Sequence, residues 1–408
     1  MSRHQSLIWL YPTLLYLACG EGPSGGTARL ARDSAGVRII DVSLPQWRPG
    51  EEWLLNPDPT VVIGGGDSER DQLFRVGGAV RLGDGTLVIA NLGSSELRYH
   101  DSSGQWFRNG GRPGEGPGEF GIGTGPWSLG KLPADTVVAW DFGNLRLSLF
   151  DRRGDFVSSA TLRPKQGTAL RFAGVLSDGG IVVYTDPLIE AAIRGGHPVG
   201  KVFRDTLKYQ LYSSDGVWSR DIAALPGAER WTFEWSGQIQ QTQRPFGRAP
   251  STTVGNGSFY YTSGDGYDIL RFNVGGRLEA IMRIRSETRN LGRQDISDFI
   301  QDRMAAAPDT PADRHAWRSL LDNAPFPEQL PAFDGLKVDQ LGNLWARLYS
   351  TPSDSAATWM VLGPDEGLLG RVAMPLALRP YEIGVDYVLG AWRDTADVEY
   401  VRMYRIMK

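Results

Sequence analysis

The 408-residue sequence has few of the residue types that carry most metal and nucleophile chemistry. It contains one cysteine, Cys19, and four histidines. A single cysteine excludes an intramolecular disulfide and any zinc site built on several cysteines. A Ser-His-Asp triad in the mature chain would have to recruit His100, His197 or His315, and His197 is the better candidate because it lies in a glycine-rich insertion. The composition therefore favours a protein without these chemistries.

The chain also lacks an excess of positive charge. Its formal net charge is -4 and its isoelectric point is about 5.7, so no nucleic-acid partner is expected. It has no calcium loop of the D-x-D-x-D-G type. The glycine-rich stretch at 110–118 does not suit a phosphate, because Pro113 and Pro117 lack the backbone N–H groups that such a loop needs. We expect no cofactor and no metal.

The N-terminal apolar run is too short to span a bilayer. It covers Leu7–Ala18, about a dozen residues, whereas a spanning helix needs roughly 20. A charged start, an apolar middle and small residues at the end are typical of a secretory signal peptide. The end at Cys19 resembles a bacterial lipobox, although Tyr16 stands where leucine is usual. The resemblance implies a lipoprotein-type signal peptide over 1–19, with a lipid on Cys19.

The residues after Cys19 indicate a tether and a cell address. Residues 20–36 are rich in small residues without an apolar period, which predicts a flexible linker. Gly20 is not the aspartate that typically retains such proteins in the inner membrane. The resemblance implies an exported lipoprotein of the outer membrane, facing the periplasm or the cell surface.

Turn-forming residues are abundant, with 51 glycines and 25 prolines, and they occur in a repeated pattern. An apolar strand follows a polar turn, and a second strand then ends in a further polar turn with glycine. The pattern is clear at 84–104, 178–216 and 255–276, and looser copies lie at 135–154 and 339–364. Repetition of this kind is typical of a β-propeller.

The repeats predict an all-β domain over 37–408. Five blades are expected at about 74–108, 127–162, 171–222, 251–284 and 336–374. The last unit, near 387–406, holds only two or three strands, whereas a blade usually has four. The strand at 61–63 would complete it and close the ring. The expectation is six blades, with seven as the competing count.

Two insertions interrupt the repeats. The alternating segment 230–235 predicts an extra hairpin between blades three and four. The segment from about 292 to 328 is helical, since Ile296, Phe299, Ile300 and Met304 share one helical face. A second helix is expected to begin at Pro311, with Trp317, Leu320 and Leu321 as its apolar stripe. This helical insertion should cover one face of the propeller near blades four and five.

A family resemblance rests on the loop that begins at Gly110, G-G-R-P-G-E-G-P-G-E-F. It resembles a loop of the six-bladed β-propeller family of bacterial exported proteins and lipoproteins, relatives of the NHL-repeat propellers. The segments 342–345 and 394–404 are similar to the fifth blade and the closing strand of that family. The resemblance covers roughly residue 37 to the end and implies a fold, with little chemistry.

Two groups of residues are candidate binding sites. Arg112, Glu115 and Glu119 could face a ligand if their loop lines the channel mouth, although a tight connection between blades explains the loop as well. Exposed tryptophans could stack on sugars or peptides, although propellers also pack aromatic residues between blades. The members of this second group are Trp127, Trp231 and Trp235.

The sequence leaves two functions open. The first is a non-catalytic scaffold that binds a small ligand or a protein partner, with membrane association through the N-terminal lipid. The second is a carbohydrate- or peptide-processing enzyme, a lyase or hydrolase, with its site at a channel mouth. The side chains at the channel mouths should discriminate between them: clustered ionisable groups favour the enzyme, and an apolar groove on a side face favours a partner surface.

Overall fold

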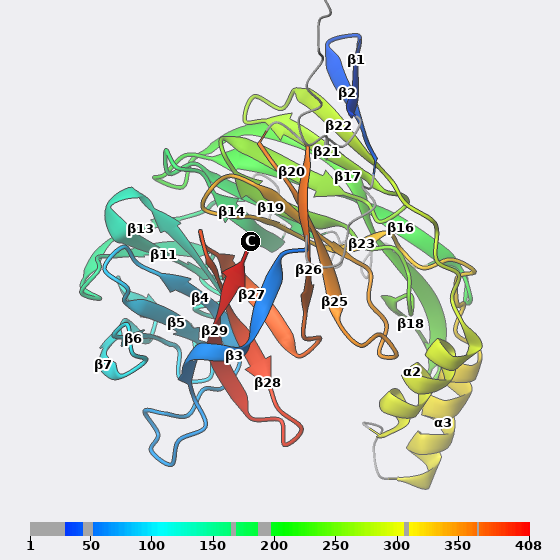
Figure 1. The fold of residues 1–408 in the computed structure, drawn as a ribbon. Coiled ribbons are helices and arrows are strands. Elements are labelled where there is room, and N and C mark those ends of the chain that lie inside the picture. Colours follow the sequence, from blue (N-terminus) through cyan, green and yellow to red (C-terminus); the bar gives the residue numbers. More distant parts are fainter. Residues whose placement is uncertain (1–28, 44–51, 165–168, 187–196, 306–309, 365–366) are drawn as a thin grey trace, which may run out of the picture.

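The computed structural model describes residues 29–43, 52–164, 169–186, 197–305, 310–364 and 367–408. Strands predominate in these ranges, and two α-helices lie in the second half of the chain (Figure 1). The predicted signal peptide and Cys19 fall outside the described residues. Neither described helix has the length and apolar character needed to cross a membrane.

Six sheets of four or more strands make up most of this structure, and we number them in chain order by their first strand. Sheet one contains β4 (Val76–Arg81), β5 (Leu87–Asn91), β6 (Glu96–His100) and β7 (Trp106–Gly110). Sheet two contains β10 (Ser128–Leu132), β11 (Thr136–Asp141), β12 (Arg146–Phe150) and β13 (Phe156–Thr161). Sheet three contains β14 (Ala169–Val175), β15 (Ile181–Asp186), β16 (Val202–Tyr212), β17 (Trp218–Trp235) and β18 (Gln238–Gln243).

The second half of the chain forms the other three sheets. Sheet four contains β19 (Ser251–Gly255), β20 (Ser258–Thr262), β21 (Asp268–Asn273) and β22 (Leu278–Arg285), extended by β2 (Val37–Ser43) and β1 (Arg29–Ser34). Sheet five contains β23 (Phe333–Val338), β24 (Leu344–Leu348), β25 (Ala357–Leu362) and β26 (Leu368–Met374). Sheet six contains β27 (Leu378–Ile383), β28 (Tyr387–Arg393), β29 (Glu399–Met407) and β3 (Leu54–Ile63).

The first strands of the six sheets form a closed cycle. Strand β4 contacts β10, and the contacts continue through β14, β19, β23 and β27 back to β4. Six hydrophobic clusters follow the same cycle, each shared by two neighbouring sheets. In one of them Trp140 of sheet two stacks on Phe172 of sheet three, with ring centroids 6.0 Å apart. This is a propeller-type arrangement, in which the first strands surround an axis.

The repeated glycine turn has a local cause. In the turn between β6 and β7, the Asp101 carboxylate accepts hydrogen bonds from the backbone N–H groups of Ser103 and Gln105, at 2.9 and 3.0 Å. Asp151 does the same between β12 and β13. The turn then needs a left-handed residue, and its glycines have φ of 92°, 83°, 83° and 84° at Gly104, Gly154, Gly216 and Gly276. The periodicity of the sequence thus reflects one turn geometry used in successive sheets.

The predicted completion of the last sheet is confirmed. Strand β3, from the N-terminal part of the chain, pairs antiparallel with β29 near the C-terminus, and Ile63 lies opposite Val401 (Figure 1). The pairing covers the edge that β29 would otherwise leave open.

Part of the expected tether is ordered. Residues 20–36 were predicted as a flexible linker, but Arg29–Ser34 forms β1, which pairs with β2 across the turn at Ala35 and Gly36. Strand β2 pairs in parallel with β22, the outer strand of sheet four. The sheet edge supplies hydrogen-bond partners that composition alone does not reveal, so the linker prediction was wrong for these residues.

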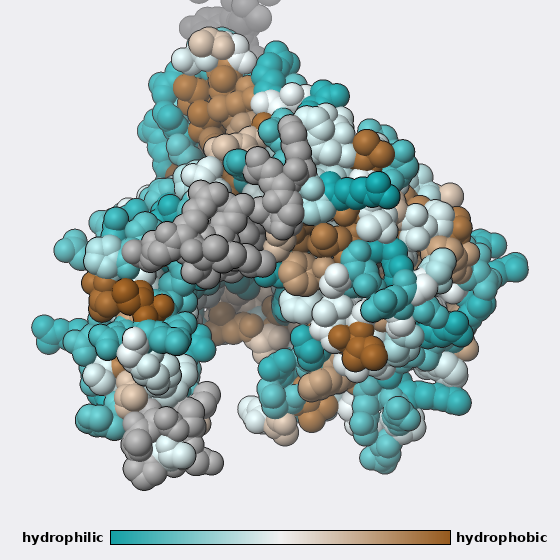
Figure 2. Space-filling view, turned by 180° about the vertical axis from the view of Figure 1, so that it is seen from behind, coloured by the Kyte–Doolittle hydropathy of each residue, from teal (hydrophilic) through white to brown (hydrophobic). Residues whose placement is uncertain are grey.

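The helices are α2 (Arg293–Ala305) and α3 (Pro311–Asp322), both inside the predicted insertion. They pack beside β17 and β18 of sheet three (Figure 1). Helix α2 also contacts the β24–β25 connection of sheet five, where the Ser353 hydroxyl donates to Asp295. The extra hairpin predicted at 230–235 is present: this segment is the end of the long β17 and pairs antiparallel with β18 across the turn at 236–237. Seen from behind, the helices form a lobe separated from the rest of the lower edge by a notch (Figure 2).

Candidate functional site

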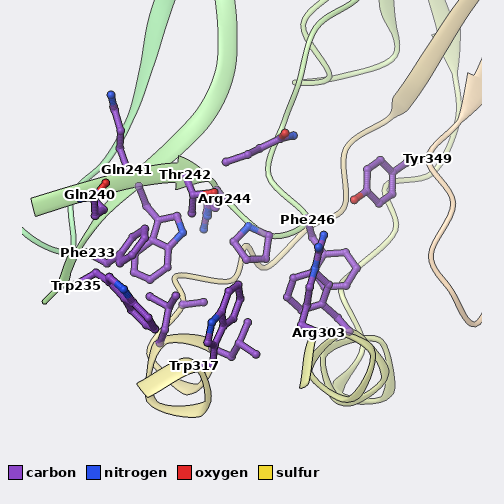
Figure 3. A pocket seen from close by; sticks show the side chains of 17 residues that line it. Phe233, Trp235, Gln240, Gln241, Thr242, Arg244, Phe246, Arg303, Trp317 and Tyr349 are labelled. Carbon is purple, nitrogen blue, oxygen red and sulfur yellow. The ribbon is translucent and has the colours of Figure 1, made fainter. Parts of the chain in front are cut away.

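A groove of about 750 Å³ lies between the β17–β18 ribbon and the two helices (Figure 3). We call it the aromatic groove. Its principal lining residues are Trp231, Phe233, Trp235, Gln240, Gln241, Thr242, Gln243, Arg244, Phe246, Phe299, Arg303, Trp317, Leu320, Leu321 and Tyr349. Its volume is within the usual range of small-molecule sites.

The floor of the groove follows from strand alternation. Successive side chains of a strand point to opposite faces, so Trp231, Phe233 and Trp235 share one face of β17. Opposite them on β18 lie Thr242, Gln240 and Gln238, respectively. The stripe of three aromatic residues is therefore bordered by uncharged polar side chains, and Figure 3 shows Phe233 and Trp235 directed toward the helices.

The helices form the opposite wall. Trp317 of α3 meets Trp235 edge to face, with centroids 6.1 Å apart and planes at 68°. Phe299 of α2 packs against Phe246 at 5.3 Å. Of the apolar stripes predicted from the sequence, that of the second helix lines the groove with all three residues and that of the first with Phe299. Helix α2 has no fully buried residue.

Polar groups of the groove are only partly satisfied. Trp231 is 4% exposed, and its indole Nε1–H has no hydrogen-bond partner among the described residues. Arg244 is occupied, because it pairs with Glu229 at 3.0 Å and donates to the Pro325 carbonyl. Burial raises the pKa of Tyr349 to about 12, so this hydroxyl stays protonated at neutral pH. The groove can stack flat apolar faces and donate hydrogen bonds to an acceptor oxygen.

A second space, of about 320 Å³, lies on the axis between the first strands, and we call it the axial pocket. Five of the six first strands line it: β4, β10, β14, β23 and β27. Its charged residues are Asp334, Lys337, Arg347 and Arg379. Asp334 forms an ion pair with Arg347, yet burial raises the pKa of the Asp334 carboxyl. Burial, and to a smaller extent the nearby Arg379, lower the pKa of Lys337 to about 8.

The predicted channel-mouth loop does not line this pocket. Glu119 turns back on its own loop, where it accepts from the Gly116 N–H at 2.8 Å and pairs with Arg112 at 2.7 Å. These two contacts hold the pKa of Glu119 below its ordinary value. Arg146, at the start of β12, donates to the Glu115 and Glu119 carbonyls. The loop packs between sheets one and two, where Phe120 is buried against Phe150, and it therefore lies away from the axial pocket.

The three tryptophans predicted as a binding surface lie in two different places. Trp231 and Trp235 both line the aromatic groove. Trp127 lies before β10, 42% exposed and beneath the Arg75 guanidinium, 5.9 Å from its ring. The structure thus brings together two of the three residues singled out from the sequence.

No described histidine lines either space. His100 is buried in sheet one, where burial lowers its pKa to about 4. His197 packs on the ring of Phe203 at 4.0 Å, and His315 is exposed on α3. Across the described ranges, no group of three or more metal-binding side chains occurs.

Sequence reasoning missed Lys337, Asp334, Tyr349 and Phe246. Each occupies an ordinary strand or loop position, and no motif marks it. The signal that could have found the first two is the presence of two charged residues on β23, a first strand that should face the axis.

Comparison with known proteins gives distant likenesses. No family model and no curated protein matches the chain. A Bacteroides fragilis protein classed as exported is 11% identical over 91% of this chain and 100% of its own, with a TM-score of 0.46. A DUF4221 family member of Bacteroides vulgatus is 9% identical over 88% and 99%, also at 0.46. A gluconolactonase of Xanthomonas campestris is 12% identical over 86% and 96%, at 0.42. Since these scores are all below 0.5, the likenesses say nothing about the activity of this chain.

Proposed function

We propose that this protein is an exported, non-catalytic binding protein: a six-bladed β-propeller anchored by a lipid on Cys19, with the aromatic groove as its ligand site. The signal-peptide pattern ending at Cys19 supports export and anchoring. The closed cycle of six first strands supports the blade count. The outer-membrane location rests on Gly20, which is not the retention residue.

The ligand we propose is a carbohydrate chain. The observation that carries this is the pairing of aromatic platforms on both walls, Trp235 and Trp317, with uncharged amides along one rim. Sugar rings present flat apolar faces to aromatic rings and hydroxyl oxygens to donors such as the Trp231 indole N–H. An extended peptide fits less well, because peptides that add to a sheet use a strand edge, whereas this floor is a sheet face.

Titration calorimetry with soluble glycans tests this proposal. A panel of xylan, laminarin and chitin oligosaccharides is titrated into the wild type, and we expect at least one to bind. Trp235→Ala and Trp317→Ala should each weaken that binding at least tenfold, because each removes a stacking platform. Trp127→Ala is the matched control, since this exposed tryptophan lies outside the groove.

Two outcomes would contradict the carbohydrate proposal. One is binding that all three substitutions weaken equally. The other is a panel that does not bind while extended peptides do, with affinity lost in Trp235→Ala. Thermal melting of each variant shows whether the substitution removed only a contact to the ligand, which leaves the melting temperature unchanged, or also undocked the helices from the sheet, which lowers it.

An enzyme acting on carbohydrate or peptide at the axis is the second candidate, and the clustered ionisable groups of the axial pocket favour it. Asp334 is the acidic residue among them, and a carboxyl group can act as a general acid or base in such chemistry. If this is right, incubation with a cleavable chain should release new ends, and Asp334→Asn should abolish the release. An unchanged rate in Asp334→Asn would exclude this role.

A further inference from the structure

The axial pocket carries more positive than negative charge. Lys337, Arg347 and Arg379 face one acidic residue, Asp334. Arg347 is already neutralised, because its Nε donates to Asp334. Two cations, Lys337 and Arg379, therefore remain without a carboxylate of their own in this pocket.

The nearest other carboxylate is engaged elsewhere. Glu382, on β27, accepts hydrogen bonds from the Arg81 N–H at 3.0 Å and the Gln340 amide at 2.7 Å. It also accepts from the Tyr387 hydroxyl and lies 3.6 Å from the Lys131 ammonium. Its lone pairs are thus largely used by these donors, and it acts on Lys337 as a nearby charge without a direct hydrogen bond in the described structure.

Lys337 and Arg379 have weak partners. The only acceptor recorded for the Lys337 ammonium among the described residues is the Tyr381 carbonyl, at 3.3 Å. Arg379 lies over the Tyr381 ring, 5.3 Å from its centroid. An ammonium has three N–H donors, so Lys337 can donate to a further acceptor. Two like charges near each other in a partly desolvated space favour the entry of an anion.

A buried donor in the same pocket adds an independent observation. Trp359, 3% exposed, lines the pocket, and its indole Nε1–H has no hydrogen-bond partner among the described residues. An unpaired buried donor costs free energy that a ligand oxygen would recover. The remaining wall is apolar and includes Leu129, Phe172 and Leu336.

We propose that the axial pocket binds a small organic carboxylate, with its anionic head at Lys337 and Arg379 and its apolar body against the side chains of β10, β14 and β23. A volume of about 320 Å³ suits a ligand at the small end of the usual range. This site is independent of the aromatic groove and does not depend on the carbohydrate proposal.

Benzoate is the probe, and benzyl alcohol is its neutral counterpart of similar shape. Calorimetry or the shift in melting temperature measures binding at pH 7. We expect benzoate to bind the wild type, benzyl alcohol to bind at least tenfold more weakly, and Lys337→Met to weaken benzoate at least tenfold. Arg379→Gln should weaken it by a smaller factor, because Arg379 is exposed at the rim. Lys208→Met, which removes the same charge from an exposed position on β16, should leave it unchanged.

Four results would overturn the proposal. The first is no benzoate binding to the wild type. The second is equal affinity for benzoate and benzyl alcohol, which would make the pocket a purely apolar site. The third is an equal loss of benzoate affinity in Lys337→Met and Lys208→Met, which would show that the net charge of the protein, and not Lys337 in the pocket, attracts benzoate. Tighter binding of inorganic phosphate than of benzoate would likewise reject the carboxylate class. Trp235→Ala changes the aromatic groove and not the axial pocket, so we expect this variant to bind benzoate like the wild type. The two proposals can therefore fail independently.

Discussion

At the scale of single residues, Lys337 ties stability to pH. The ordinary pKa of lysine is 10.5, and in the folded chain burial lowers it to about 8. Between these pH values the unfolded chain holds more protons than the folded chain, so the free energy of unfolding rises with pH over this interval. Below pH 8 the full cost of the buried charge is present, and it disappears as pH approaches 10.5.

Lys337→Met should therefore stabilise the protein at pH 7. One pKa unit corresponds to about 1.36 kcal/mol, so the gain in the free energy of unfolding is at most about 3 kcal/mol. It should shrink to nearly zero by about pH 10.5. Urea unfolding of both proteins across this pH range measures it. A variant that is less stable than the wild type at pH 7, or a difference independent of pH, would be inconsistent with a desolvated ammonium.

The repeated turn glycines allow a second residue-scale prediction. Gly216 has φ of 83°, and a Cβ atom there would lie 2.8 Å from the Thr161 carbonyl oxygen, a backbone atom of the neighbouring sheet. Gly257 has φ of 66° but open space around its Cβ position. Gly257→Ala should cost about 1 kcal/mol of stability for the left-handed backbone alone. Gly216→Ala should cost about 3 kcal/mol, because the close contact is added to that strain.

Chemical unfolding of the two glycine variants gives the comparison directly. Equal losses in the free energy of unfolding would mean that the neighbouring sheet shifts to make room for the Cβ atom. The left-handed turn geometry alone would then explain the glycine at Gly216.

At the scale of elements, the pairing of β3 with β29 closes the ring of sheets. Deleting residues 400–408 removes β29 and leaves β28 and β3 with unpaired edges. It also removes Val401, Tyr404 and Ile406 from the clusters that join sheet six to its neighbours. We expect aggregation or loss of cooperative melting, because open edges recruit other strands.

Size-exclusion chromatography and calorimetry test this truncation. Deleting Lys408 alone is the control, since it lies after the end of β29. A monomeric truncated chain that melts like the wild type would contradict the closing role of this strand.

At the scale of the whole molecule, the prediction concerns the anchor. Cys19→Ser should release the protein from membranes into the soluble fraction, because one sulfur carries the proposed lipid and the chain has no other cysteine. Labelling with a fatty-acid analogue and membrane fractionation measure it. Unchanged labelling or unchanged sedimentation with membranes would disprove lipidation at this residue, while leaving the ligand sites untouched.

The sequence by itself determined the repeating architecture. Strand alternation and turns such as Asp101 to Gly104 depend on residues a few positions apart, and such local signals can be read without a structure. The same reasoning predicted that the strand at 61–63 completes the last sheet and that the second helix begins at Pro311. An incomplete repeat and a proline at a helix start are also local patterns.

Only the tertiary structure decided where the candidate sites lie. The axial pocket gathers Lys337, Trp359 and Tyr381 from three strands, and the aromatic groove joins Trp235 to Trp317, 82 positions further along the chain. The sequence also did not show that the helices pack beside β17 and β18, since an amphipathic face specifies that it is buried but not against what. Pockets form where side chains from distant segments converge, and that convergence depends on how the sheets pack around the axis rather than on any single stretch of sequence.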